Sequence, residues 1–363
     1  MAKKRSADGT LFAVTIGLVF FGLVMLYSAS AVVADAAHRS SYFFLNKQSL
    51  WAAIGLLVMS VLMRVDYRRL QRPVLVYGFL FLSIALLIAV LFSPPLKNAH
   101  RWLRLGLLSF QPSEMAKLSL VLAVAYFLDQ KRERINDFFA SLFLPLAVTV
   151  FLAFLVLIEP DFGTAACFLF VGFCLFFVAG APFRYMVGIA TAAAPLLYLL
   201  IVRVDYRRDR LLTFLDPFED PLGRGFQIIQ SLIAVGTGGI LGAGFMRSRQ
   251  KMFYLPEPHT DFIFSVIGEE LGLLGALALL GAFVVILWRG VVIARRAPDF
   301  FGSLLASGLT ALIVGQALIN LSVSLGLVPT TGITLPFISA GGSSMVTSLA
   351  AIGVMLGISQ HAR

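Results

Sequence analysis

The chain has 363 residues, of which 59% are hydrophobic and only 13% are charged, and its mean hydropathy is +0.90. This composition excludes a soluble globular protein, and repeated apolar runs of about 18 residues or more are typical of a polytopic membrane protein. No polar interval is long enough to bury a core of its own, so we expect a single membrane domain over residues 1–363. The net charge of +10 then serves membrane topology and contact with anionic lipid headgroups rather than nucleic-acid binding.

Ten apolar runs predict an all-α protein with ten transmembrane helices. They cover roughly residues 11–33, 48–63, 74–92, 113–129, 140–158, 163–180, 185–202, 260–288, 301–322 and 343–360. The first run follows a basic N-terminus as in a signal peptide, but it is long enough to span and is expected to be retained. The segments on the side of the two termini carry about 15 Lys and Arg residues, against about five in the short loops opposite, so we expect both termini in the cytoplasm.

An acid stands where the longest polar interval meets the eighth apolar run. Pro256 and Pro258 hold the approach extended, so Thr260 is expected to cap the next helix and to place Asp261 in its first turn. A carboxylate beside lipid is energetically costly and therefore suggests a function. An acid in a first helical turn is also favoured by the helix dipole, so a plain helix start is an equally good interpretation.

A second group of polar residues begins the fourth run, with Arg101 in the outer segment before it. Ser113 is a possible cap of this helix. Glu114 and Lys117 are three residues apart and share one helix face, which predicts an ion pair between them. An unpaired lysine on the membrane side would be costly, although a purely structural pair or a lysine that reaches the headgroups explains the pattern equally well.

Two further outer segments carry charge. The turn EPDFG at 159–163 holds two acids, and Asp161 is expected to cap the following helix. The interval 203–259 is expected to form one long extracytoplasmic loop between helices seven and eight, and its glycine-rich middle predicts a segment that lies at the interface or folds onto the bundle. Bases at its two ends could hold a phosphate-bearing headgroup or simply be solvated near anionic lipid: Arg207, Arg208, Arg210, Arg247, Arg249 and Lys251.

The last polar features flank the ninth and tenth runs. Gln316 and Asn320 are four residues apart on one face, which suits packing against another polar helix. The proline- and glycine-containing loop 328–344 ends in the motif GGSS at 341–344. Backbone N–H groups at that helix start can face an anion, but a plain helix cap is the commoner meaning of such a motif.

Glu114, Lys117, Asp161, Asp261 and the GGSS motif are all expected on the outer side of the membrane. Polar groups beside lipid indicate a substrate with an apolar tail and a charged head. The sequence contains no HExxH, CxxC, P-loop or GxSxG motif, so the residues alone do not choose an enzyme over a transporter. The hexapeptide RVDYRR, which occurs at 64–69 and 203–208, is the one hint of an inverted transporter repeat, but no wider similarity accompanies it and a chance repeat explains it better.

Six segments, in order along nearly the whole chain, resemble the SEDS family (shape, elongation, division and sporulation). They are GLVMLYSAS (22–30), RWLRLGLLSFQPSEMAKL (101–118), EPDFGTA (159–165), GFQIIQSLIAVGTGGILGAG (225–244), YLPEPHTDFIFSVIGEELG (254–272) and PTTGITLPFISAGGSS (329–344). The stretch SRQKMFYLPE resembles the division-type FtsW branch more than the elongation-type RodA branch. Ala340 departs from the family pattern, in which an aromatic residue precedes GGSS, and this bears on the details of that loop.

The resemblance implies a ten-helix bundle in the bacterial cytoplasmic membrane that polymerises lipid II into glycan strands at the outer face. It also implies a partner transpeptidase with a single membrane helix, a class B penicillin-binding protein. The family's essential acid falls on Asp261, and its other polar cavity positions fall on Glu114, Lys117 and Asp161.

The implied activity is that of an inverting glycosyltransferase in which Asp261 is the general base towards the 4-hydroxyl of the acceptor sugar. Lys117, held by Glu114, would stabilise the charge that develops on the leaving pyrophosphate. Asp161 would position a sugar or a divalent cation, although no metal-ligand spacing supports a resident metal and no cofactor is required. The other substrate-binding candidates are Arg101, Arg207, Arg210, His259, Ser343 and Ser344.

Two alternatives stay open at this point. A lipid II flippase would place the acids along a path through the bundle, and it would translocate its substrate without making polymer. A scaffold that only recruits the transpeptidase would leave the costly Lys117 without an explanation.

Overall fold

The structure, a computed structural model, describes residues 6–94, 100–105 and 108–362. In this part of the chain a helix occupies the place of each of the ten expected spans: α1 (Gly9–His38), α2 (Phe43–Arg64), α3 (Pro73–Leu91), α4 (Pro112–Gln130), α5 (Phe143–Ile158), α6 (Phe162–Val178), α7 (Phe183–Val202), α10 (Ile263–Arg296), α11 (Phe300–Ser324) and α12 (Gly342–Ser359). Among the described residues, seven helices are long and apolar enough to cross a membrane. The protein is therefore a multi-pass membrane protein, and ten as the exact number of spans stays a prediction.

Shorter elements connect these helices. They are the 3-10 helices Tyr67–Gln71 and Arg132–Arg134, a π-helical turn at Phe138–Leu142, the helices α8 (Asp205–Leu215) and α9 (Phe226–Thr237), and the strands β1 (Leu103–Leu105) and β2 (Leu108–Phe110). The two strands pair antiparallel, with Leu103 opposite Phe110. This small hairpin is the one departure from the expected all-α class within the described residues, and it lies in the outer segment that precedes α4.

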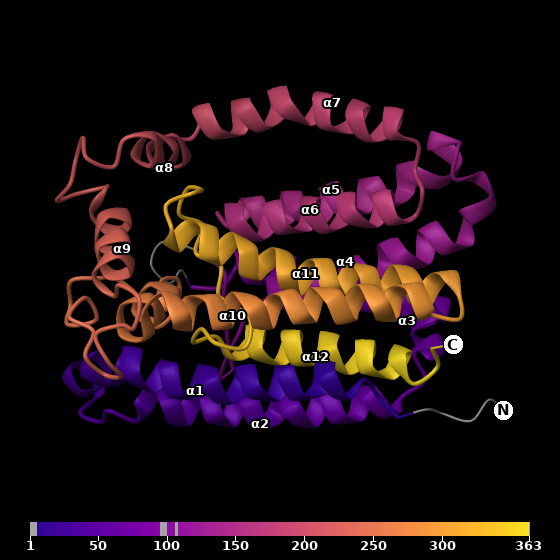
Figure 1. Ribbon diagram of the computed structural model, residues 1–363. Helices are drawn as coiled ribbons and strands as arrows, with labels where there is room; N and C mark the ends of the chain where they lie inside the picture. Colours follow the sequence, from indigo (N-terminus) through magenta and orange to yellow (C-terminus); the bar gives the residue numbers. More distant parts are fainter. Residues whose placement is uncertain (1–5, 95–99, 106–107, 363) are drawn as a thin grey trace.

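The long helices lie side by side, with both ends of the chain at one end of the bundle and α8 and α9 at the other (Figure 1). Termini at the same end agree with an even number of spans. The interval 203–259 belongs to the opposite end, as expected for a loop on the other side of the membrane, while the side that faces the cytoplasm stays a prediction.

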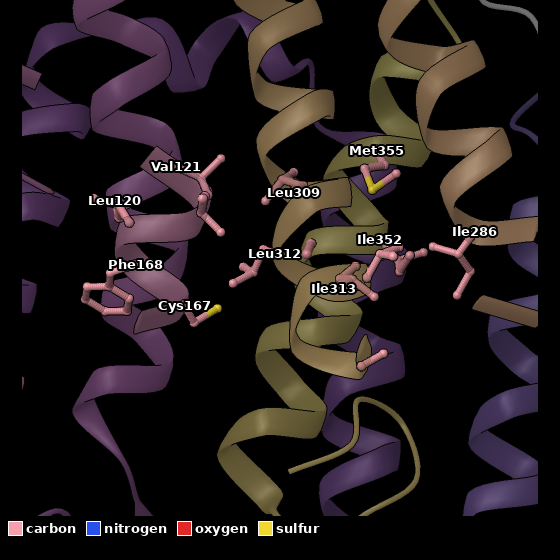
Figure 2. Close-up of a cluster of buried hydrophobic side chains, with 14 of the residues drawn as sticks. Leu120, Val121, Cys167, Phe168, Ile286, Leu309, Leu312, Ile313, Ile352 and Met355 are labelled. Carbon is pink, nitrogen blue, oxygen red and sulfur yellow. The ribbon is translucent and has the colours of Figure 1, made fainter. Parts of the chain in front are cut away.

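The core lies around α11 and α12, which are buried over 78% of their most apolar stretches, whereas α2, α3 and α10 are buried over 22%. Figure 2 shows part of this core, where side chains from five helices meet: Leu120, Val121, Cys167, Phe168, Ile286, Leu309, Leu312, Ile313, Ile352 and Met355. A helix surrounded by other helices can carry polar groups on its inner face, because partners there satisfy them away from lipid. The central position of α11 therefore makes room for Gln316 and Asn320, which are both buried.

The glycine-rich part of the interval 203–259 folds onto the bundle, which confirms one of the two expected placements. It packs against an interruption in α10 at Gly272, where the backbone leaves the helical region with φ 64° and ψ −162°. The N–H of Ala243 donates to the carbonyl of Glu269 (2.9 Å), and the N–H of Leu273 donates to that of Gly239 (2.9 Å). Backbone groups freed by the interruption are thus paired, as membrane depth requires.

This close contact explains why the segment that packs against α10 is rich in glycine. At Gly242, where φ is +81°, a Cβ atom would lie 2.2 Å from the carbonyl oxygen of Glu270. A left-handed backbone and so short an approach both favour glycine. The eighth span therefore differs from the expected 260–288: it begins at Ile263, is interrupted at Gly272 and continues to Arg296.

Candidate functional site

The loop 325–341 between α11 and α12 connects several elements at the end of the bundle opposite the termini. It accepts a hydrogen bond from α8, where Arg210 Nη1 lies 2.6 Å from the carbonyl oxygen of Thr330. On α11, the amide nitrogen of Asn320 donates both to the carbonyl of Ile333 (2.7 Å) and to that of Asp261 (2.9 Å). Asn320 of α11 therefore ties the loop to the segment that carries the principal candidate acid, while Arg210 of α8 holds the loop itself.

Lys117 is the centre of a buried polar network beneath this loop. Its ammonium donates to Glu114 Oε1 at 2.8 Å and to Gln316 Oε1 at 2.8 Å, and only 3% of Lys117 is exposed. The expected ion pair with Glu114 is therefore present. The amide nitrogen of Gln316 in turn reaches the carbonyl of Thr334 (2.9 Å), and the Thr334 hydroxyl donates to Ser344 Oγ (2.9 Å). A buried charge of this kind is stable only with such partners, so the lysine is held in one position.

Asp261 lies two residues before α10 and remains partly exposed, so a substrate can reach it. A Cβ atom added at Gly332 would lie 3.6 Å from Asp261 Oδ2 and 4.0 Å from Arg101 Nη1, so the carboxylate and the guanidinium both lie close to this glycine. Burial raises the pKa of Asp261 to about 6, and the negative charge of Glu257 adds to this, while Arg210 and Arg101 oppose it. A carboxylate with that pKa is ionised at neutral pH and is a better base than an ordinary aspartate.

The sequence predicted that Thr260 caps α10 and that Asp261 lies in its first turn, and this prediction is wrong. Thr260 does not cap α10, because the helix begins at Ile263 after Phe262, which makes no side-chain cap. The Thr260 carbonyl instead accepts a hydrogen bond from the Ser339 hydroxyl (2.6 Å). Asp261 therefore belongs to the loop-held segment before the helix, and the helix dipole gives no sufficient reason for an acid at this position.

The turn between α5 and α6 supplies a second acid, Asp161, which caps α6 as expected. Its two carboxylate oxygens accept from the backbone N–H (3.1 Å) and the hydroxyl (2.9 Å) of Thr164. Arg101 binds the same turn: its Nε donates to the carbonyl of Glu159 (3.2 Å), and a terminal nitrogen donates to the carbonyl of Pro160. Arg101 and Asp161 both influence the pKa of Asp261, so these three charged groups form one electrostatic unit.

Glu159 is a functional candidate that the sequence did not single out. It is fully buried, and neither of its carboxylate oxygens has a hydrogen-bond partner among the described residues. Burial and the negative charge of Asp161 raise its pKa to about 9, against the influence of Arg101. Glu159 is therefore a neutral acid at neutral pH. In the sequence it looks like an ordinary turn residue, and only its burial reveals it.

Three further residues among the expected substrate-binding candidates also make contacts within the protein. Ser343 Oγ accepts a hydrogen bond from the backbone N–H of Gln111 (3.0 Å), and the ring of His259 packs 4.5 Å from that of Phe44. Arg207 on α8 donates to the carbonyl of Leu157 at 3.2 Å. Ser343 and His259 thus connect elements of the scaffold, whereas Ser344 belongs to the Lys117 network.

Two other expectations concern the same end of the bundle. The first N–H of the GGSS motif, that of Gly341, donates to Gln48 Oε1 (3.2 Å) and is therefore already paired, while an anion at the other N–H groups of the motif stays a prediction. Ser113 does not cap α4, which begins after Gln111 without a side-chain cap. Gln48 was missed because a neutral amide in an apolar run carries no distinctive signal.

Lys251 was expected either to hold a phosphate-bearing headgroup or to be solvated near anionic lipid, and its burial excludes both interpretations. Its ammonium lies 2.7 Å from Glu270 Oε1 and 3.0 Å from Ser28 Oγ, and all three side chains are fully buried. Glu269 beside it accepts from the backbone N–H groups of Arg249 (2.8 Å) and Gln250 (3.3 Å). These contacts anchor the segment before Asp261 onto the interrupted helix α10 and onto α1.

Comparison with known proteins now decides the family. The family model described as "Cell cycle protein", which covers FtsW, RodA and SpoVE, matches residues 9–363. The chain belongs to this family. It is the SEDS family that the sequence motifs indicated, and the match extends over nearly the whole chain.

Two relatives match this chain over nearly its full length. The chain is 44% identical over 356 residues to the probable peptidoglycan glycosyltransferase FtsW of Geobacter sulfurreducens, with 97% of this chain and 95% of the relative covered. It is also 44% identical over 368 residues to the stage V sporulation protein E of Bacillus subtilis, with 99% of each chain covered. The expected likeness to the FtsW branch is confirmed, and the sporulation protein is equally similar.

Solved structures agree with the fold. A chain from a structure described as "Structural coordination of polymerization and crosslinking by a peptidoglycan synthase complex" matches with a TM-score of 0.80 and 35% identity, with 97% of both chains covered. The rod shape determining protein RodA of Thermus thermophilus matches with a TM-score of 0.71 and 30% identity, with 97% of this chain and 96% of that chain covered. The SEDS bundle is therefore the fold of this protein.

Proposed function

We propose that this protein is a peptidoglycan glycosyltransferase that polymerises lipid II at the outer face of the bacterial cytoplasmic membrane. The observation that carries the proposal is Asp261, a partly exposed carboxylate whose pKa is raised to about 6 and whose charge interacts with those of Arg101 and Arg210. A base beside two cations suits a reaction in which a hydroxyl loses its proton while an anion departs. The name of the FtsW relative from Geobacter sulfurreducens supports the same activity.

The mechanism follows from these positions. Asp261 accepts the proton of the acceptor's 4-hydroxyl as that oxygen forms the new bond to the anomeric carbon of the donor. The undecaprenyl pyrophosphate leaves from the opposite face, so the configuration inverts. Asp161 and Arg101 hold the turn beside the base and orient the sugar, while Arg210 stabilises the negative charge of the departing group.

The buried position of Lys117 changes its role in this proposal. Its contacts with Glu114 and Gln316 link it to Thr334 in the loop that also holds Asp261 through Asn320. Lys117 therefore acts as a positioning residue for the loop, and Glu114 holds the lysine in place through their ion pair.

The remaining parts of the proposal concern the cellular setting. Both termini lie in the cytoplasm, and the site at the opposite end of the bundle faces outwards. The partner is a class B penicillin-binding protein, a proposal supported by the likeness to a chain of a peptidoglycan synthase complex. The role is in cell division or sporulation, because relatives named for FtsW and for sporulation are equally similar. A divalent cation beside Asp161 also stays a prediction.

Incubation of the purified protein with labelled lipid II in detergent, with and without the matching transpeptidase, tests the activity. Detergent micelles have no second compartment, so polymer formed there cannot result from translocation. We expect glycan chains of many disaccharide units. If no combination yields polymer while proteoliposomes translocate labelled lipid II, the flippase alternative replaces the enzyme.

A further inference from the structure

A groove opens between α5 and α7 at the end of the bundle opposite the candidate site. Because α5 runs towards the turn that carries Asp161, its first residues lie at the other end, beside the start of α7. The groove has a volume of about 640 Å³, within the range of about 300–1,000 Å³ that is typical of small-molecule sites. In Figure 1, α7 lies apart from α5 and α6 over most of its length. No step of the proposed reaction uses this α5–α7 groove.

The walls of the groove are mostly hydrophobic. Its α7 side consists of positions 184, 185, 188, 189, 192 and 193, a spacing that places them on one face of the helix. This face is about 14 Å long, close to half the thickness of a bilayer's hydrocarbon core, which is about 15 Å. The groove therefore has the length and the polarity to hold a hydrocarbon chain within one leaflet. The apolar lining residues include Phe139, Leu146, Val150, Ile189, Ala192 and Ala193.

Two opposite charges line the polar end of the groove. Asp137 precedes α5 and Arg184 lies in the first turn of α7, and both side chains are exposed. Neither has an ion-pair partner among the residues that the structure describes. Asp137 Oδ1 accepts a hydrogen bond from the N–H of Ala140 (3.2 Å), which leaves its second carboxylate oxygen for a ligand.

Tyr185 holds the two sides of this polar end in place. Its hydroxyl donates to the carbonyl of Asn136 (3.0 Å), and its ring lies 5.5 Å from that of Phe138. Arg184 Nη2 donates to the same hydroxyl (3.1 Å), and the guanidinium lies 4.8 Å from the centre of the Tyr185 ring. A guanidinium has five N–H donors, so Arg184 can keep this contact and still bind a phosphate. The cation is therefore oriented before a ligand arrives.

The pair of charges selects among membrane lipids. A phosphate suits Arg184, whereas a headgroup with only negative charge would be repelled by Asp137. A primary ammonium beside the phosphate can donate hydrogen bonds to that carboxylate, and a quaternary ammonium has no N–H to donate. A helix of a partner protein fits less well, because 14 Å of a helix about 10 Å across would occupy roughly 1,100 Å³.

We propose that the α5–α7 groove binds one phospholipid whose headgroup carries a phosphate and a primary ammonium, as in phosphatidylethanolamine. The phosphate binds Arg184, the ammonium binds Asp137, and one acyl chain lies along the apolar face of α7. The bound lipid fills the space that separates α7 from α5. This assignment does not depend on the proposed glycosyltransferase function, since the groove and the candidate site lie at opposite ends of the bundle.

Native mass spectrometry of the delipidated full-length protein tests the site by titration with single phospholipids. We expect phosphatidylethanolamine to bind at least about tenfold more tightly than phosphatidylglycerol or phosphatidylcholine. Ala192→Leu, which fills the groove, and Arg184→Gln, which removes the cation, should each weaken binding of phosphatidylethanolamine at least about tenfold. The matched controls are Ala190→Leu, exposed on another face of α7, and Arg134→Gln, an exposed arginine outside the groove; both should stay within about twofold.

Asp137→Asn tests the selectivity for the headgroup, because it keeps a side-chain oxygen for Ala140 but removes the negative charge. The preference for phosphatidylethanolamine over phosphatidylglycerol should fall to within about twofold in this variant. Glu133→Gln, an exposed acid-to-amide change outside the groove, should keep the preference of the unchanged protein. A preference that survives in Asp137→Asn would overturn the assigned contact with the ammonium.

Equal binding of the three lipids by the unchanged protein would overturn the proposal, as would binding within twofold in both Ala192→Leu and Arg184→Gln at an unchanged Tm. If a variant fails to fold, a phosphatidylethanolamine with a photoreactive acyl chain is used on the unchanged protein. Cross-links to peptides from α5 and α7 support the site, and cross-links confined to other helices overturn it. In the purified complex with the transpeptidase, loss of the lipid together with cross-links from α7 to the partner's membrane helix would assign the groove to that partner instead.

Discussion

Acidification should slow polymerisation because Asp261 must be ionised to act as a base. With its pKa raised to about 6, the ionised fraction falls from roughly 0.9 at pH 7 to roughly 0.1 at pH 5. The rate of the chemical step should therefore fall by about tenfold over this range. An ordinary aspartate, with a pKa of about 3.9, would lose less than about a tenth of its ionised form over the same two units. The sign is fixed by the direction of the shift: the active base is present above about pH 6 and is lost below it.

The assay is the initial rate of polymer formation from labelled lipid II at saturating substrate, measured from pH 5 to pH 8 in detergent. Glu257→Gln removes a negative charge that raises the pKa of Asp261, so its midpoint should move to lower pH. Glu219→Gln, an exposed acid-to-amide change on the loop after α8, is the matched control and should leave the midpoint unchanged. A rate that is flat between pH 7 and pH 5, or a midpoint that rises in Glu257→Gln, would refute the assignment of Asp261 as the base.

Three changes elsewhere test the scaffold. Lys117→Met leaves Glu114 as a buried charge without its partner and should destabilise the protein by about 3–5 kcal/mol, which is measured as a lower Tm in detergent. Adding Glu114→Gln should restore stability but not polymerisation, and a double variant without any recovery of Tm would contradict the pairing. Gly238→Ala brings a Cβ atom to 2.0 Å from a backbone carbonyl oxygen of α10 and should destabilise the protein by roughly 1–3 kcal/mol. Gly236→Ala, whose Cβ would meet no atom within 4 Å, should be neutral or stabilising. Equal Tm values for the two variants would count against the close contact. Lys251→Met should also destabilise the protein by about 3–5 kcal/mol, the cost typical of a broken buried pair, and so lower its Tm. An unchanged Tm would show that this ion pair contributes nothing to stability.

Most of the helical framework was predictable from the sequence because apolar length alone identifies a span. The ends were less predictable: α10 begins at Ile263 rather than at Thr260, and it is interrupted at Gly272. The interruption depends on backbone contacts with residues 239–244, and such long-range pairing leaves no periodic signal in the sequence. The glycines there indicated an irregular segment, but not the helix that it would meet.

The candidate site was predictable where a residue is costly in a membrane. Lys117 and Asp261 stood out for this reason, and the pairing of Lys117 with Glu114 followed from their spacing. Gln48 and Thr334 stayed hidden because neutral polar residues in loops and helices are common. Lys251 was misassigned because its partner, Glu270, is brought to it only by the fold.

The central claim, that Asp261 is the base of a lipid II polymerase, is tested most directly by one variant. Asp261→Asn keeps the size and polarity of the side chain while it removes the ability to accept a proton. In the detergent assay with labelled lipid II, we predict a loss of polymerisation by about 10²- to 10⁴-fold at an unchanged Tm and with unchanged binding of undecaprenyl diphosphate. Polymer formed at the rate of the unchanged protein would contradict the account.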